Sequence, residues 1–93
     1  SNRILQNHQG VILMVTLQDV KAGMSITHDY NDATLQIYFD EVIDFIKDSG
    51  VAEKNITAGL VTRGVSDLWN YGGDKGVLSP YFLERATQLA YKE

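Results

Sequence analysis

The chain has 93 residues, a formal net charge of −4 and no cysteine. Its length supports one domain with a modest core, and no run approaches the roughly 18 apolar residues that a membrane span requires. The lack of cysteine excludes disulfides and thiolate metal sites, and the acidic balance disfavours nonspecific binding of nucleic acid because like charges repel.

The first 13 residues are expected to lie outside the folded domain. Codons for Gln9, Gly10 and Val11 can read as a ribosome-binding sequence shortly before the codon of Met14. We therefore hypothesise that the natural protein starts at Met14 and that residues 1–13 are a translated leader or cloning remnant without fixed structure. Residues 14–93 then form a single helical domain.

Two helices are predicted in the first half of this domain. Thr16 is a suitable N-cap for a short helix that ends near Gly23. A longer helix is predicted to begin after Asp29 or Asn31 and to end at Gly50, which can adopt the left-handed conformation that stops a helix. Apolar residues recur at three- and four-residue spacing in this second helix and predict a buried stripe of Leu35, Phe39, Val42, Ile43 and Ile46.

A third helix is predicted to begin between Val51 and Asn55 and to continue to Trp69. Gly59 and Gly64 lower its helix propensity, so we expect a close helix crossing at one of them. Phe39 and Trp69 are the expected aromatic anchors of the core.

The last helix is predicted to follow a glycine-rich loop at residues 72–76. Ser79 is its expected N-cap and Pro80 its first residue. Its expected apolar face consists of Phe82, Leu83, Ala86, Leu89 and Ala90. Because no segment alternates as a strand does, the predicted fold is all-α: a small bundle of about four helices with a glycine-rich loop before the last one.

No catalytic, cofactor-binding or metal site is predicted, and the chain is not expected to be an enzyme. His8 and His28 are the only histidines, and neither is placed beside a second base or ligand; His28 is expected in a solvent-facing turn. Residues 29–32 begin like a calcium loop, but Thr34 and Asp40 stand where glycine and glutamate are required. Helix capping is the better interpretation of this turn.

Several apolar and loop residues are candidates for an interface. Part of the apolar surface of the second helix lies beyond its main stripe, and the glycine-rich loop lacks the pattern of a phosphate-binding loop. Such loops often become ordered against a neighbouring molecule. The candidate interface residues are Tyr38, Phe45, Gly72, Gly73, Asp74, Lys75, Gly76 and Tyr81.

The sequence contains two further patterns of charged residues. Arg63 and Asp67 are four residues apart and are expected to pair along the third helix. The second helix carries an acidic strip. The favoured interpretation is a solvent-exposed face of the helix, and a binding site for a divalent cation is the less favoured one. The acidic strip consists of Asp40, Glu41, Asp44 and Asp48.

Five segments follow one another in a distinctive order. They are a Thr-Leu-x-Asp-Val segment at residues 16–20, an Asp-rich turn at 29–32, an aromatic helix end at 68–71, the glycine-rich loop at 72–76 and a Leu-x-Pro-like stretch at 78–81. This order resembles the head-tail connector proteins of siphophages, which are also called head-completion adaptors. The likeness covers nearly all of residues 14–91, although the family's usual basic residue after the third-helix aromatic is Asn70 here.

The resemblance implies a structural virion protein, made in the cytoplasm of a bacterial host and located at the head-tail junction. Its implied partners are further copies of itself in a ring, the portal protein, and a head-closure or tail protein, with no cofactor and no membrane. DNA would pass through the ring without specific binding. The acidic strip is a candidate for the channel-facing surface, where like charge would keep the duplex from sticking.

The alternative function is a small all-helical DNA-binding or regulatory interaction module. The number of helices favours it, but the third helix offers only Arg63 to a phosphate backbone and then continues with Asp67. A small enzyme or metal protein built on the acidic strip would need a pocket that a four-helix chain of this size rarely forms.

Overall fold

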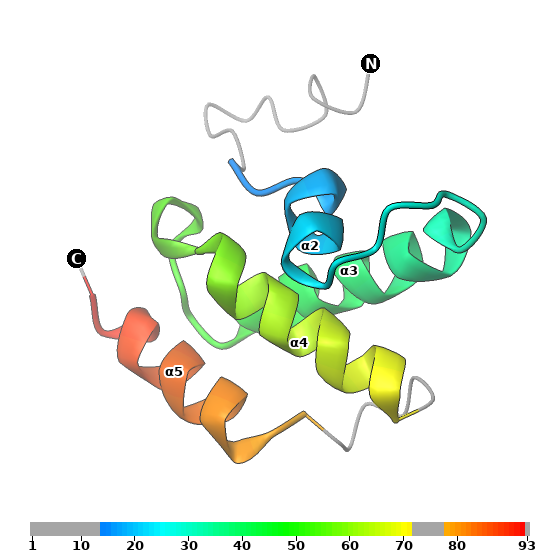
Figure 1. Cartoon of the computed structure of the whole chain (residues 1–93). Helices are drawn as coiled ribbons and strands as arrows, with labels where there is room; N and C mark the ends of the chain where they lie inside the picture. The colour runs from blue at the N-terminus through cyan, green and yellow to red at the C-terminus, as the bar shows by residue number, and fades with distance from the viewer. Residues whose placement is uncertain (1–13, 72–77, 93) are drawn as a thin grey trace.

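The computed structural model describes residues 14–71 and 78–92, which form four α-helices, one 3₁₀ helix and no strand (Figure 1). The elements are α2 (Leu17–Gly23), α3 (Asp32–Asp48), η1 (Glu53–Asn55), α4 (Ala58–Asn70) and α5 (Pro80–Ala90). The predicted all-α fold is thus confirmed. The expectations for residues 1–13 and for the glycine-rich loop concern residues outside the described ranges.

Side-chain caps fix the start of three helices. The Thr16 hydroxyl accepts the backbone N–H of Asp19, and the Asp19 carboxylate accepts the N–H of Thr16, so both ends of a capping box are present. Ser79 accepts the N–H of Phe82 at 3.2 Å, and Pro80 follows it as the first residue of α5. The predicted starts of α2 and α5 are confirmed.

The start of α4 differs from the prediction. Residues 53–55 form the separate turn η1, and α4 begins only at Ala58. The reason is local, because the Thr57 hydroxyl accepts the N–H of Leu60 at 3.1 Å and so caps a new helix there. Ile56 is buried but lies in extended backbone outside the helix.

The turn before α3 also differs in detail. Asn31 occupies the N-cap position, yet its side chain makes no capping hydrogen bond. Asp32 instead accepts the Nζ of Lys21 at 2.6 Å, which ties the start of α3 to α2. Lys21 is buried, so this ion pair compensates a charge that burial alone would disfavour. The opposite end of α3 agrees with the prediction, since Gly50 has a φ of +95°.

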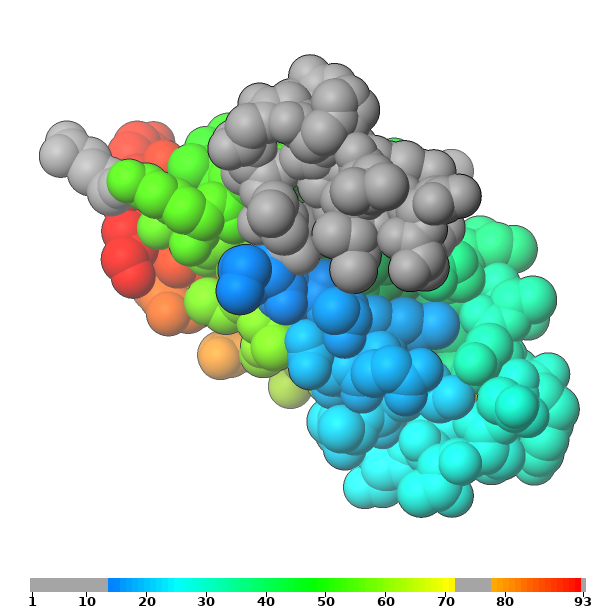
Figure 2. Space-filling view, turned by 90° about the horizontal axis from the view of Figure 1, so that it is seen from above, coloured from blue at the N-terminus to red at the C-terminus, as the bar shows by residue number. Residues whose placement is uncertain are grey.

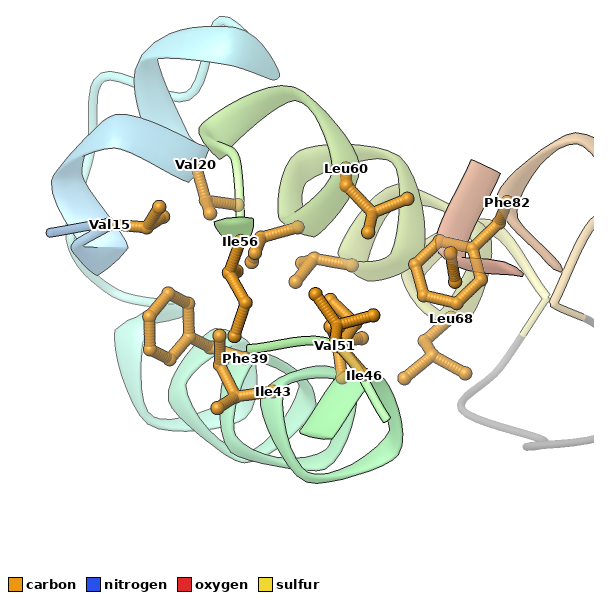
Figure 3. Close-up of a cluster of buried hydrophobic side chains, with 14 of the residues drawn as sticks. Val15, Val20, Phe39, Ile43, Ile46, Val51, Ile56, Leu60, Leu68 and Phe82 are labelled. Carbon is orange, nitrogen blue, oxygen red and sulfur yellow. The ribbon is translucent and has the colours of Figure 1, made fainter. Parts of the chain in front are cut away.

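The core gathers around α4, which contacts each of the other three α-helices. In Figure 3 Val15 and Val20 enter this core at one end, and Phe82 lies beside Leu68 at the other. The predicted stripe of α3 is buried in full. The largest fully buried side chains are Phe82, Leu35, Ile46, Leu68, Leu89, Val20, Val42, Val61 and Val65.

Two predicted core residues lie nearer the surface. Leu83 is 42% exposed, because the buried stripe of α5 is narrower than the sequence indicated. Trp69 is half-buried and packs against the core from outside, with its ring edge-on to Tyr38 at a centroid distance of 6.4 Å. Phe39 is buried, as predicted.

A close helix crossing occurs at Gly64 and not at Gly59. A Cβ atom on Gly64 would lie 2.7 Å from Phe82 Cε1 and 2.7 Å from Val42 Cγ1. A Cβ on Gly59 would meet nothing within 4 Å. Gly64 therefore lets α4 approach α3 and α5 together, which explains a glycine in the middle of a helix despite its propensity cost.

The arrangement leaves one face of α4 at the surface. Figure 1 and the view from above in Figure 2 place α5 at the end of the molecule opposite the turn that leads into α3, with α2 between them.

In the described part of the chain no helix has both the length and the apolar character needed to cross a membrane.

Candidate functional site

A surface groove of about 600 Å³ runs along the outer face of α4. The end of α2 and the turn after it contribute Gly23, Met24 and Ile26, and α5 contributes Tyr81. The residues from α4 are Gly59, Thr62, Arg63, Ser66, Trp69 and Asn70. Three segments that are distant in the sequence thus meet in one hollow.

Helical periodicity explains why this face of α4 is free to form a groove. The opposite face of the helix buries Leu60, Val61, Gly64, Val65 and Leu68 in the core. At the α2 side the walls approach closely, because a Cβ on Gly23 would lie 2.9 Å from Thr62 Cγ2. Gly23 is the last residue of α2, and its lack of a side chain allows α2 to pack tightly against α4 beside the groove.

Among the described residues that line the groove, Arg63 alone is charged. Its guanidinium lies over the Tyr81 ring, 5.0 Å from the ring centroid, in a cation-π contact that bridges α4 and α5. Its Nε is 3.7 Å from Asp67 Oδ1, so the predicted Arg63–Asp67 pair is present. The guanidinium is thereby held in one place at the surface.

Asp67 is buried, which the sequence did not indicate. Its Oδ2 accepts the backbone N–H of Ser79 at 3.0 Å, and its Oδ1 faces Arg63. One carboxylate therefore connects the last turns of α4, the start of α5 and the guanidinium in the groove. A structural role in positioning Arg63 and Tyr81 follows from these contacts.

Asp67→Ala is expected to lower the free energy of unfolding by about 1–2 kcal/mol, because the Ser79 N–H loses its acceptor. Asp67→Asn keeps an amide oxygen for that N–H and should lose less. Urea unfolding of both variants measures the difference. Equal losses in the two variants would show that the hydrogen bond to Ser79 is not the main contribution.

The acidic strip lies on the side of α3 that faces away from the core. Asp40, Asp44 and Asp48 are exposed, and Glu41 is half-buried. Asp40 accepts the side-chain N–H of Gln36 at 2.9 Å. Helix α3 holds five acidic residues and one lysine, a net charge of −4 that equals the formal charge of the whole chain. The acidity of the protein is thus concentrated on one helix.

The predicted interface residues do not form a single surface. Tyr81 is 57% exposed and lies in the groove under Arg63, whereas Tyr38 is half-buried and reaches the groove only through its contact with Trp69. Phe45 is partly exposed and packs against Phe82, with ring centroids 5.9 Å apart, outside the groove lining. Gly72, Gly73, Asp74, Lys75 and Gly76 lie outside the described residues.

His28 lies in the turn before α3, as predicted, and is half-buried there. Its ring stacks on Tyr30 at a centroid distance of 3.9 Å and an interplanar angle of 12°. Its Nδ1 is buried without a hydrogen-bond partner among the described residues.

Residues 14–71 and 78–92 contain no group of three His, Asp or Glu side chains placed to hold a metal ion. The groove is instead a mixed surface, lined by apolar Met24, Ile26 and Trp69 and by polar Thr62 and Ser66. Such a surface is suited to recognising another polypeptide.

Comparisons with protein-family models, with curated proteins and with solved structures found no match to this chain.

Proposed function

We propose that the chain is a structural subunit of a phage or prophage head-tail connector, a ring that joins the portal to the tail or head-closure protein and surrounds the exiting DNA. The protein would be made in the host cytoplasm and would reside in the virion. Its role would be mechanical and would require no cofactor or catalysis.

The observation that supports this proposal is the order of the family-like segments relative to the folded elements. Residues 16–20 form the capping box and first turn of α2, and residues 29–32 form the turn into α3. Residues 68–71 end α4, and residues 78–81 cap and begin α5. Segments that carry the resemblance therefore coincide with the joints between helices, where a shared fold needs particular residue types.

The charge distribution also supports a role in assembly over a role in DNA recognition. Helices α4 and α5 together carry Arg63 and Arg85 against Asp67 and Glu84, so they present no net positive charge. A recognition helix needs several cations that reach phosphates. The alternative of a DNA-binding regulator is weakened on this ground.

Native mass spectrometry across a concentration series, with a mobility-shift assay on duplex DNA, tests the proposal. A connector subunit is expected to form a closed high-order oligomer, alone or with the portal protein, and to leave duplex DNA unshifted at physiological salt. A salt-sensitive shift of duplex DNA by a monomer or dimer would instead favour the regulator.

A further inference from the structure

We propose that the groove on α4 binds the outer face of α3 from a second copy of the chain, with Ile37 of that copy seated in the groove and its Asp40 and Asp44 next to Arg63. This inference rests on the proposed ring assembly and names the contact that would build it. The outer face of α3 is defined here by Ile37, Asp40, Asp44 and Asp48.

The groove presents a cation beside apolar residues. The Arg63 side chain is 49% exposed, whereas the side chain of its partner Asp67 is only 10% exposed. An incoming molecule therefore meets the guanidinium and not the carboxylate that neutralises it. Met24, Ile26 and Trp69 pack only partly into the core and offer apolar contact area in the same hollow.

The outer face of α3 presents the complementary chemistry. Ile37 is 64% exposed, a large apolar side chain that the described fold leaves uncovered. Asp40 and Asp44 follow it at three- and seven-residue spacing, so all three share one side of the helix. Within residues 14–71 and 78–92, Asp40, Asp44 and Asp48 form no ion pair. An apolar side chain followed by carboxylates on the same side of a helix matches a groove that offers apolar residues and one arginine.

The two surfaces lie on opposite sides of the packed α3 and α4 helices. Helix α3 turns its buried stripe toward α4, and α4 turns its own buried stripe toward α3, so the acidic face and the groove point away from each other. Contact between two different surfaces of identical subunits is head-to-tail, and it closes into a ring when the rotation allows. The proposed contact therefore propagates from copy to copy, as a ring requires.

Pairwise cysteine cross-linking tests the contact directly, because the natural chain has no cysteine. Ser66→Cys places a thiol in the groove, and Asp44→Cys places one on the outer face of α3. Mixing the two variants at high concentration under mild oxidation is expected to give mainly the mixed disulfide, identified by intact mass. Gln88→Cys, on an exposed part of α5, replaces Ser66→Cys as the control and should show no preference for Asp44→Cys.

Variants of the charged and apolar residues on the outer face of α3 then test whether the disulfide forms through the proposed contact or through random collision. Asp40→Lys with Asp48→Lys in the Asp44→Cys chain should lower the mixed-disulfide yield by about two- to fivefold, because the exposed ion pair of Asp40 with Arg63 is lost and positive charge is placed near the guanidinium. Ile37→Ser should also lower it, and circular dichroism checks that each variant stays folded. A mixed-disulfide yield equal to that of the control, or one insensitive to these changes, would overturn the proposal.

The outcomes distinguish this inference from the proposed function. One outcome is a ring whose cross-links join other surfaces and in which Asp40→Lys and Asp48→Lys create salt-sensitive DNA binding. This outcome would place the acidic strip at the channel. It would overturn the proposed contact, while the connector role stands. The other outcome is a specific disulfide between Ser66→Cys and Asp44→Cys in an assembly that is absent from phage particles. This outcome would support the contact and contradict the connector role.

Discussion

Phe82→Ala is expected to lower the free energy of unfolding by about 3–5 kcal/mol, the range for removing a fully buried phenylalanine. The Phe82 side chain is completely buried, packs against Phe45 and reaches Gly64 of α4. Its loss would leave a cavity between α3, α4 and α5. Because domains of this size are stable by only about 5–15 kcal/mol, the variant should be close to unfolding at moderate temperature.

Leu83→Ala is the matched control, since Leu83 follows Phe82 on the same helix but is 42% exposed. Its cost should stay below about 1 kcal/mol. Urea unfolding followed by circular dichroism compares the two variants with the natural chain. If both variants lost the same stability, the assignment of Phe82 to the centre of the core would be wrong.

Gly64→Val is expected to cost about 3 kcal/mol, at the upper end of the range for overpacking a core. Its Cβ would lie 2.7 Å from both Phe82 Cε1 and Val42 Cγ1, so two helices would have to move apart. Gly59→Val, in the same helix, meets nothing within 4 Å of its Cβ. That variant should be slightly stabilised, because valine has a higher helix propensity than glycine.

Gly64→Val is thus expected to lower the stability of the domain, and Gly59→Val to raise it slightly. Thermal melts of both variants, at one protein concentration and pH, measure it. A stable Gly64→Val variant would contradict the close crossing of α4 with α3 and α5. A Gly59→Val variant as unstable as Gly64→Val would show instead that the whole of α4 resists β-branched residues.

The helices could be predicted from the sequence because their signals are local. Each signal depends on residues within a few positions of each other. This holds for the N-caps Thr16 and Ser79, for the helix end at Gly50 and for the apolar stripe of α3. The start of α4 was predicted too early for a similar reason: the apolar pattern continues through Ile56, but the Thr57 cap decides where the helix begins.

The candidate site could be predicted only in fragments. Tyr81 was a candidate interface residue, and the spacing of Arg63 and Asp67 predicted their pairing. The groove itself depends on the end of α2, the outer face of α4 and the start of α5 meeting in space. The burial of Asp67 likewise depends on the Ser79 N–H, twelve residues away, which no local pattern encodes.

The half-buried position of Trp69 also depends on contacts that are distant in the sequence. Its spacing in α4 fits an apolar face, but that face is wider than the surface that α3 and α5 cover, so Trp69 remains at the edge beside Tyr38. Periodicity shows which residues share a side of a helix and does not show how far the neighbouring helices extend. The result is a large aromatic side chain on the rim of the groove.

The central claim is that the chain is part of a head-tail junction, and immunogold electron microscopy of purified particles tests it most directly. Antibody raised against the protein would be applied to particles of the phage or prophage that, on this proposal, encodes it, both intact and with heads separated from tails. The proposal predicts gold at the neck of intact particles and at the separated portal end of the head or the adjoining end of the tail. Mature particles that lack the chain, or that carry it only on the capsid shell or tail tip, would contradict the proposal.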